Sequence, residues 1–295
     1  MKKTISIRLF KTLLKAKALL SEEAQKRMAD FVLSQRMEDG SFMNKNGQSD
    51  LYYTAFGWML SYVLDIPSDR RRMDMYLSRQ ETKEMDLIHY AAFMRCRMIR
   101  LLMDSGGRVK WLFRSFSATE IKPLEDFTGV PHNDIHSPYT QFIWLSLLED
   151  TGNRIKDKKE VLHLLESYQA VAGGYMNSTD GITATTNATV AALAIKGQFE
   201  GYNDNTDIHF LYNLQAPSGG FAATQASPLP DLLSTATALF MLSCYGVKPK
   251  YVAKDFIEAH WLDSGGFSAT LMDETSDVEY AFYGLLALGT DGDFN

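Results

Sequence analysis

Three stretches of the chain repeat one pattern: a glycine pair, an aromatic residue, a polar loop and a segment of low charge. They read GGYMNSTDGITATTNATVAALAI at 173–195, GGFAATQASPLPDLLSTATALFML at 219–242 and GGFSATLMDETSDVEYAFYGLLAL at 265–288. The aromatic residues stand 46 residues apart, at Tyr175, Phe221 and Phe267. A fixed period of this length is typical of proteins built from stacked helical units.

The period continues toward the N-terminus. A further copy reads SQRMEDGSFMNKNGQSDLYYTAFGWML at 34–60, and two weaker copies begin their low-charge segments near Asp86 and Asp134. The 227 residues from Asp50 to Asp277 make five steps of about 45. We therefore expect six units over roughly residues 22–289.

Each unit holds two helical stretches of different character. The first is charged and amphipathic, as at 158–168 and 250–262, and the second carries few or no charges, as at 51–64 and 232–245. A helix that is apolar all round must be covered on every side, whereas a helix with one polar face can lie outside. Six such pairs predict an all-α fold, an α/α toroid with inner and outer helix rings, as a single domain over 22–295.

Glycines mark the end of the first stretch in four units. A helix often ends in a residue with positive φ, which glycine adopts without steric cost. We expect the outer helices to end at Gly40, Gly173, Gly219 and Gly265.

Residues 1–21 are expected to form a separate basic amphipathic helix. Lysines interrupt its apolar positions, whereas a secretory signal needs an unbroken apolar core. The helix either packs on the body of the protein, which is the simpler interpretation, or lies on an anionic membrane surface.

The amino-acid composition limits the classes of protein to which the chain can belong. Hydrophobic residues make up 45% and charged residues 22% of the chain, which is typical of a globular protein. The net charge of −6 lacks the basic footprint of a nucleic-acid-binding protein. Cys96 and Cys244 form no disulfide framework, and no uncharged apolar run reaches about 18 residues. We expect a cytoplasmic protein, peripheral to a membrane if the N-terminal helix binds one.

The glycine-aromatic turns and the Thr/Ser/Ala-rich segments after them resemble the repeats of protein prenyltransferase β subunits and squalene/oxidosqualene cyclases. The glutamines before the turns, as in Gln35…Phe42, Gln169…Tyr175 and Gln215…Phe221, look like the glutamine-to-aromatic motif of the cyclases. The resemblance covers nearly the whole chain. It implies a toroid whose central cavity binds isoprenoid chains against aromatic walls, and it makes a helical partner subunit conceivable.

The usual catalytic residues of this superfamily are replaced here. The resemblance aligns Asp231 with a zinc-binding aspartate, but Leu233 stands where the cysteine ligand belongs and Tyr280 where the histidine belongs. The stretch 222–230 has no basic residue to hold a diphosphate, and the Asp-x-Asp-Asp motif of the cyclases is absent. A prenyltransferase-type zinc site is not expected, and the cofactor is left open.

Acidic and histidine residues near the predicted inner-helix starts are candidates for one rim of the ring. Carboxylates and imidazoles there would serve acid/base chemistry; the candidate catalytic residues are Asp231, Asp277, Glu279, His89 and His136. The simpler interpretation of the aspartates is that they cap helix N-termini. The run HNDIH offers weak metal candidates, namely His132, Asp134 and His136.

The predicted inner helices are rich in aromatic and small residues. Their aromatic rings either form a wall for an apolar chain or pack between the helices. The small residues favour an open cavity at the axis, and they are Thr185, Thr186, Ala188, Ser234, Thr235 and Ala238. The candidate substrate-binding residues are Tyr52, Tyr53, Tyr139, Thr186, Ser234 and Tyr280.

Three arginines interrupt the segment RCRMIRLL at 95–102. Arg97 and Arg100 share one helix face and Arg95 does not. They form an anion-binding group, or they belong to a helix that is partly exposed or pairs with a neighbouring chain.

The leading functional hypothesis is a prenyltransferase- or cyclase-like protein that holds an isoprenoid or other long apolar ligand in its central cavity. If it is active, it is a zinc-free transferase or a cyclase/lyase acting on a prenyl substrate. The alternatives are a noncatalytic ligand- or protein-binding module, or a carbohydrate-active toroid enzyme that uses paired carboxylates.

Overall fold

A computed structural model of the chain describes residues 4–104, 137–150, 158–199, 205–292 and 294. Most of these residues are helical, and the only sheets among them are two short antiparallel pairs. None of the described helices is both long enough and apolar enough to cross a bilayer.

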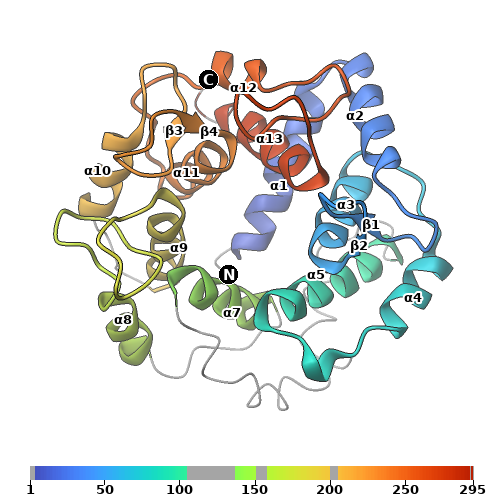
Figure 1. Cartoon of the computed structure of the whole chain (residues 1–295), viewed down its shortest axis with the longest axis horizontal. Coiled ribbons are helices and arrows are strands. Elements are labelled where there is room, and N and C mark those ends of the chain that lie inside the picture. The colour runs from blue at the N-terminus through green and yellow to red at the C-terminus, as the bar shows by residue number, and fades with distance from the viewer. Residues whose placement is uncertain (1–3, 105–136, 151–157, 200–204, 293, 295) are drawn as a thin grey trace.

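Six helices of low charge form an inner ring (Figure 1). Each packs against the next along the chain, and the last packs against the first, which closes the ring. The inner helices are α3 (Leu51–Val63), α5 (Leu87–Asp104), α7 (Pro138–Asp150), α9 (Thr186–Gly197), α11 (Leu232–Tyr245) and α13 (Val278–Asp291). The predicted toroid is thus confirmed.

An outer helix precedes five of the inner helices in the described residues. The outer helices are α2 (Glu22–Ser34), α4 (Arg70–Ser78), α8 (Lys158–Glu166), α10 (Asn205–Leu214) and α12 (Lys254–Ala259). A short 3-10 turn, Thr82–Glu84, lies between α4 and α5. The segment between α5 and α7, where the remaining outer helix is expected, lies outside the described residues.

The four repeat glycines have the predicted positive φ, but the prediction that they end the outer helices is wrong. Helix α2 ends at Ser34, and Gly40 follows six residues later with φ +87°. The Gly40 N–H donates to the Met37 carbonyl, and the Met37 N–H donates to the Ser41 carbonyl. The glycine therefore sits in a tight hairpin, where the positive φ forms the bulge that turns the chain back.

These hairpins account for the short strands. Strand β1 (Phe42–Met43) pairs with β2 (Ser49–Asp50), and β3 (Phe221–Ala222) pairs with β4 (Pro230–Asp231). Each pair places the repeat aromatic opposite the aspartate that precedes an inner helix, since Phe42 pairs with Asp50 and Phe221 with Asp231. A nominally all-α fold thus uses a few strand residues to fix the entry to each inner helix.

A threonine on the inner helix anchors the repeat aromatic. The amides of Phe42, Tyr175 and Phe221 donate to threonine hydroxyls at 2.8–2.9 Å, and each hydroxyl donates to the carbonyl of the residue four positions earlier. The threonines are Thr54, Thr189 and Thr235. In the last unit Ala281 takes this place, and the Ser276 hydroxyl accepts from the Phe267 amide instead.

Replacing Thr235 with valine is expected to destabilise the protein by about 1–3 kcal/mol, because the buried Phe221 amide loses its acceptor while the side-chain volume is kept. Chemical denaturation of the variant measures the loss. The exposed loop residue Thr179 provides the matched control, since Thr179→Val leaves no buried group unpaired. A cost for Thr235→Val no larger than that of the control would contradict this role of the hydroxyl.

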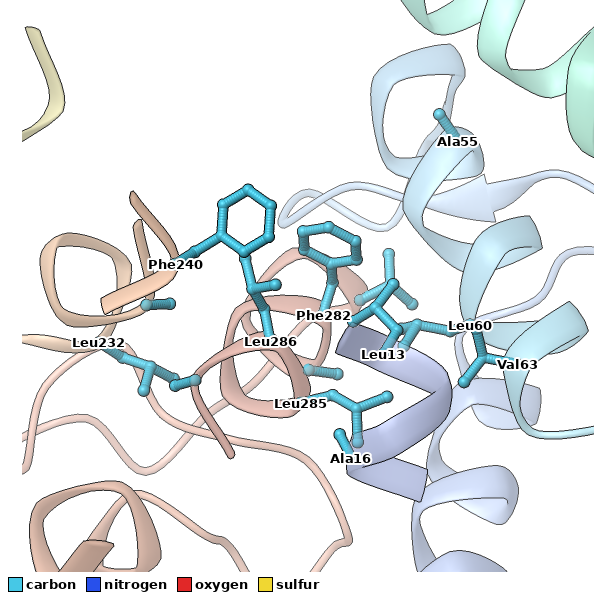
Figure 2. Close-up of a cluster of buried hydrophobic side chains, with 14 of the residues drawn as sticks. Leu13, Ala16, Ala55, Leu60, Val63, Leu232, Phe240, Phe282, Leu285 and Leu286 are labelled. Atoms are coloured by element: carbon cyan, nitrogen blue, oxygen red, sulfur yellow. The ribbon is translucent and has the colours of Figure 1, made fainter. Parts of the chain in front are cut away.

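The N-terminal helix α1 (Ile5–Leu19) packs on the body of the protein, as the simpler interpretation held. It lies at the C-terminal ends of α13 and α3 and extends toward α7 (Figure 1). Its buried residues Leu13 and Ala16 join the core beside Leu60, Val63 and Leu285, as Figure 2 shows. The helix is therefore part of the toroid core.

Candidate functional site

The inner ring surrounds a cavity of about 730 Å³, a size typical of small-molecule sites. All six inner helices and α1 contribute to its walls. Five phenylalanine rings stand in its wall, one from α1 and four from inner helices, and they are Phe10, Phe56, Phe142, Phe240 and Phe282. The cavity is thus central and mainly apolar, as the sequence predicted.

Small residues do line this cavity, but they differ from the predicted set. Thr186, Ser234 and their neighbours in that set are not among the lining residues. Thr186 donates to the Ala222 carbonyl at 2.6 Å, and Ser234 donates to Asp231 at 2.7 Å. The lining residues of the same helices stand on another face and are Asn187, Val190, Ala191, Ala194, Leu233, Thr237, Phe240 and Met241.

Helix α1 closes part of the cavity at the C-terminal ends of the inner helices. Its first turn is held by α7, since the Ser6 hydroxyl donates to Asp150 at 2.6 Å and the Ile5 amide donates to Glu149 at 3.2 Å. These carboxylates also suit the positive end of the α1 dipole. Farther along, the Arg8 guanidinium donates to the Cys244 carbonyl of α11 at 3.2 Å. The opposite end of the ring, where the inner helices begin, carries the predicted rim residues.

Glu279 is the predicted catalytic residue that lines the cavity. The Tyr52 hydroxyl donates to its carboxylate at 2.7 Å, which joins the first turns of α13 and α3. Burial raises the pKa of the Glu279 carboxyl above its usual range and is also the main reason that the pKa of Tyr52 is raised. Such an acid, held by a phenol at the edge of an apolar cavity, can serve as a proton donor or acceptor.

Two further tyrosines extend this polar strip into the cavity. Tyr139 and Tyr283 line the wall, and burial raises the pKa of both phenols. The guanidinium of Arg95 lies close enough to both to lower their pKa in part. Tyr139 and Tyr52 are among the predicted substrate-binding residues, whereas Tyr283 is not.

The aspartates at the helix starts act as N-caps, as their simpler interpretation held. Asp50 accepts from the Tyr52 amide at 2.8 Å, Asp231 from the Ser234 amide at 2.8 Å and Asp277 from the Tyr280 amide at 2.9 Å. None of them lines the cavity.

Tyr53 and Tyr280 lie outside the cavity lining, near the acidic rim. The Lys45 ammonium lies 5.0 Å from the centre of the Tyr280 ring and 3.8 Å from the Asp277 carboxylate. Burial, followed by the charge of Glu279, raises the pKa of Tyr280 to about 12.

The histidines contribute little to the described site. His89 is half exposed, bonds Asp86 at 2.8 Å through Nδ1 and does not line the cavity. The metal candidates His132, Asp134 and His136 lie outside the described residues, so their catalytic and metal roles stay predictions.

The residues present do not fit a prenyltransferase-type zinc ion. The Asp231 carboxylate is bonded to the amide and hydroxyl of Ser234, and Leu233 turns an apolar side chain into the cavity. In the part of the chain that the structure describes, no group of three or more His, Cys, Asp or Glu residues is placed to hold a metal. No zinc chemistry is derived from this site.

Sequence reasoning missed Asp150 and the α1 side chains as parts of the cavity. Asp150 follows twelve residues of α7 and looks like an ordinary helix-end acid, yet it is 5% exposed and lines the cavity. Its burial becomes visible only once α1 is placed against it.

Asp150 is expected to make stability fall as pH rises from about 4 to about 7. Burial raises the pKa of its carboxyl from 3.8 to about 6, so the folded chain holds this proton where the unfolded chain has lost it. Stability from this group is complete below pH 3.8 and is lost as pH rises through about 6, a change on the order of 3 kcal/mol. Asp150→Asn keeps an acceptor for Ser6 and removes the titration.

Denaturation of both proteins at several pH values tests this. The stability of Asp150→Asn relative to the natural protein should increase across the same pH window. A constant difference between the two proteins at every pH would contradict the raised pKa.

Comparison with known proteins agrees with this architecture. Residues 4–92 and 122–290 match the family described as the prenyltransferase alpha-alpha toroid domain. A crystal structure of a protein from Actinoplanes is similar at a TM-score of 0.53 and 14% sequence identity, over 92% of this chain and 98% of that chain. At that identity the likeness concerns the fold alone. No curated protein matches the sequence. The family match spans most of the chain, and the protein belongs to the prenyltransferase alpha-alpha toroid family.

Proposed function

We propose that the protein binds an isoprenoid or similarly long apolar molecule in its central cavity. The observation that carries this proposal is the cavity of about 730 Å³, walled by phenylalanines from four inner helices. Burial of apolar ligand surface stabilises a complex by roughly 25 cal/mol per Å², so such walls favour a hydrocarbon chain over a sugar. Few charged side chains stand in the described lining, which also disfavours a carbohydrate-active enzyme.

If the protein is active, Glu279 is the residue best placed for catalysis. It lies at the polar end of the cavity, half-buried and bonded to Tyr52 at 2.7 Å. A carboxyl with a raised pKa can donate a proton to a substrate or accept one from it. The reaction would be a transfer or a cyclisation of a prenyl chain that uses no prenyltransferase-type zinc.

A noncatalytic binding module is the second candidate. It is supported by Leu233 and Tyr280, which stand where the related enzymes carry zinc ligands. Incubation with farnesyl diphosphate, followed by analysis of released pyrophosphate and of prenyl products, separates the two. Turnover supports the enzyme, and binding without turnover supports the module.

Filling the cavity should abolish ligand binding. Ala191 is buried on the cavity wall, and Ala191→Phe is expected to weaken the binding of farnesol or geranylgeraniol at least 10-fold, because the new ring occupies the ligand's space. Calorimetric titration measures binding, and thermal melting shows that each variant is folded.

Val252→Phe provides the matched control, because it adds an aromatic ring at an exposed position outside the cavity. It should bind like the natural protein. If the natural protein binds neither alcohol, or if Ala191→Phe binds them unchanged, the cavity is not the site of an apolar ligand.

A further inference from the structure

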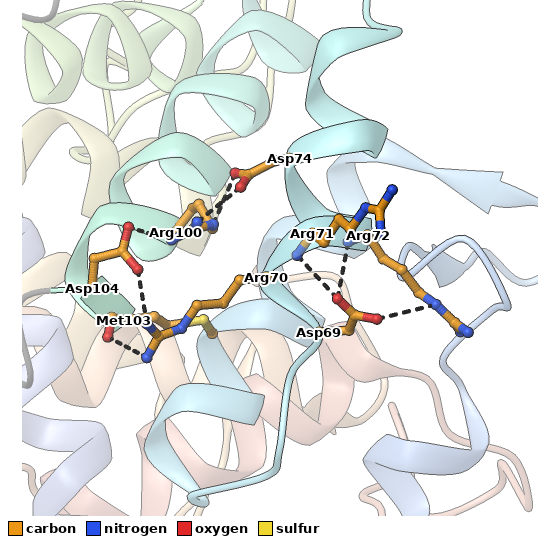
Figure 3. Close-up of polar contacts among 8 residues, drawn as sticks. All are labelled: Asp69, Arg70, Arg71, Arg72, Asp74, Arg100, Met103 and Asp104. Atoms are coloured by element: carbon orange, nitrogen blue, oxygen red, sulfur yellow. Dashed lines mark hydrogen bonds and ion pairs between the residues drawn. The ribbon is translucent and has the colours of Figure 1, made fainter.

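The three arginines of α5 have different surroundings. Arg100 points outward and pairs with Asp74 at 2.8 Å and Asp104 at 2.6 Å, as Figure 3 shows. The Arg97 guanidinium lies 5.8 Å from the centre of the Phe93 ring. Arg95 stands on another face of the helix and lines the central cavity. It is therefore the one of the three that meets a ligand there.

The Arg95 guanidinium has no directly bonded partner within the part of the chain that the structure describes. No hydrogen bond or ion pair joins its guanidinium to a described residue, although its field acts on Tyr139, Tyr283 and Asp150. The two acids of the cavity lining bond other residues, since Asp150 Oδ2 accepts from Ser6 and Glu279 accepts from Tyr52, while Asp150 Oδ1 has no hydrogen-bond partner among the described residues. A cation in mainly apolar surroundings is costly unless an anion pairs with it.

The tyrosines beside Arg95 suit an oxygen anion. Tyr139 and Tyr283 line the same cavity, and burial raises the pKa of both phenols, which therefore stay protonated. A protonated phenol donates a hydrogen bond, and a guanidinium presents a fork of donors that matches the two oxygens of a carboxylate. Together they form a donor set inside an otherwise hydrocarbon wall.

The charged residues of the cavity lining favour a ligand head group with a single negative charge. The described lining carries two basic residues, Arg95 and Lys11, and two acidic residues, Asp150 and Glu279. Lys11 is exposed on α1. A diphosphate would bring several negative charges into a wall that already holds two carboxyl groups, whereas a single carboxylate adds one negative charge beside the guanidinium of Arg95.

From these contacts we infer that the ligand is an amphiphile with a single carboxylate, which binds Arg95 while its apolar chain lies against the phenylalanine wall. This inference rests on the proposed function and adds the chemistry of the head group. Pairing of a carboxylate with the half-buried guanidinium of Arg95 is a charge-assisted, bidentate interaction, and it distinguishes an acid from the alcohol with the same hydrocarbon chain.

The test compares ligands that share one chain. Calorimetric titration with farnesoic acid, farnesol and farnesyl diphosphate is carried out on the natural protein and on Arg95→Met, Arg95→Lys and Arg97→Met, each checked for folding by thermal melting. The natural protein should bind the acid at least 10-fold more tightly than the alcohol and the diphosphate. Arg95→Met should lose this preference and keep the affinity for farnesol. Arg95→Lys should keep part of the preference for the acid, since lysine retains the positive charge but lacks the forked donors of the guanidinium. Arg97→Met should behave like the natural protein.

The outcomes separate this inference from the proposed function. Equal affinity for acid and alcohol in the natural protein overturns the inference and leaves the apolar cavity intact as a binding site. So does a preference for the acid that survives in Arg95→Met. The inference of a carboxylate head group is also overturned if the diphosphate binds more tightly than the acid and Arg95→Met loses this tighter binding. In that case Arg95 binds a phosphate group. Binding of none of the three ligands overturns the proposed function itself.

Discussion

Lys196→Met is expected to cost about 3–5 kcal/mol of folding stability, because it leaves the buried Asp207 carboxylate without its cation. The Lys196 ammonium lies 2.6 Å from Asp207 Oδ2, and the two side chains are 4% and 0% exposed. The same ammonium lies 4.8 Å from the centre of the Tyr175 ring. Burial alone would lower the pKa of Lys196, but the bond to Asp207 raises it, so the pair stays charged at neutral pH.

The double variant Lys196→Met/Asp207→Leu distinguishes the cost of an unpaired Asp207 carboxylate from the cost of removing both charges. Replacing both charges with apolar groups of similar size removes the uncompensated carboxylate, so most of the lost stability should return. Chemical denaturation of the single and double variants gives the coupling.

The exposed pair Lys254–Glu258, 3.8 Å apart, supplies the control. Lys254→Met should change stability by less than about 0.5 kcal/mol, since exposed i,i+4 pairs contribute little. If Lys196→Met costs no more than this control, the buried pair does not hold α9 to α10 as the distances indicate.

Gly289→Leu is expected to displace α1 and open the cavity at that end. A Cβ atom at Gly289 would lie 2.2 Å from the Thr12 carbonyl oxygen and 3.0 Å from Ala16 Cβ, so the α1 backbone has to move. Overpacking of a close contact typically costs about 1–3 kcal/mol. Loss of the Leu13 packing would add to this, because Leu13 is fully buried.

Hydrogen exchange on the α1 amides measures the displacement, and denaturation measures the stability. In Gly289→Leu the amides of α1 should exchange faster, while those of α9 keep their protection. The same variant should bind farnesol more weakly, because α1 forms part of the cavity wall.

The matched control is Gly197→Ala, at the end of α9, where the nearest atoms belong to the Tyr245 side chain at 3.3–3.7 Å. It is expected to be neutral or slightly stabilising, since alanine has the higher helix propensity. Unchanged α1 exchange in Gly289→Leu would show that the close approach at Gly289 is not what holds the helix.

Much of the fold could be predicted from local sequence rules. The 46-residue spacing of Tyr175, Phe221 and Phe267 identified the repeat, and the low charge of the second helix in each unit identified the inner ring. The N-caps Asp231 and Asp277 were predictable because capping depends on a residue type beside a helix start. The glycine turns were misplaced, since a positive φ serves a helix end and a hairpin bulge equally well.

The candidate site could be predicted only in part. The sequence predicts Glu279 as an acid at an inner-helix start and Tyr52 and Tyr139 as aromatic residues of the inner helices, and all three line the cavity. Thr186 and Ser234 were chosen for small size and turned out to bond the hairpins and caps instead. Size alone does not tell which face of an apolar helix looks inward, because a helix buried on all sides shows little periodic contrast.

The sequence by itself determined the repeat, the two classes of helix and hence the toroid, because these follow from period, charge and local turn chemistry. Only the tertiary structure decided which residues face the axis, that α1 closes one end, and that Arg95 stands in the cavity while Arg100 pairs outside. The physical reason is that the axis is shared by helices up to 227 residues apart in the chain, as Tyr52 and Glu279 are. A contact of that range depends on how the ring closes, which no local pattern specifies.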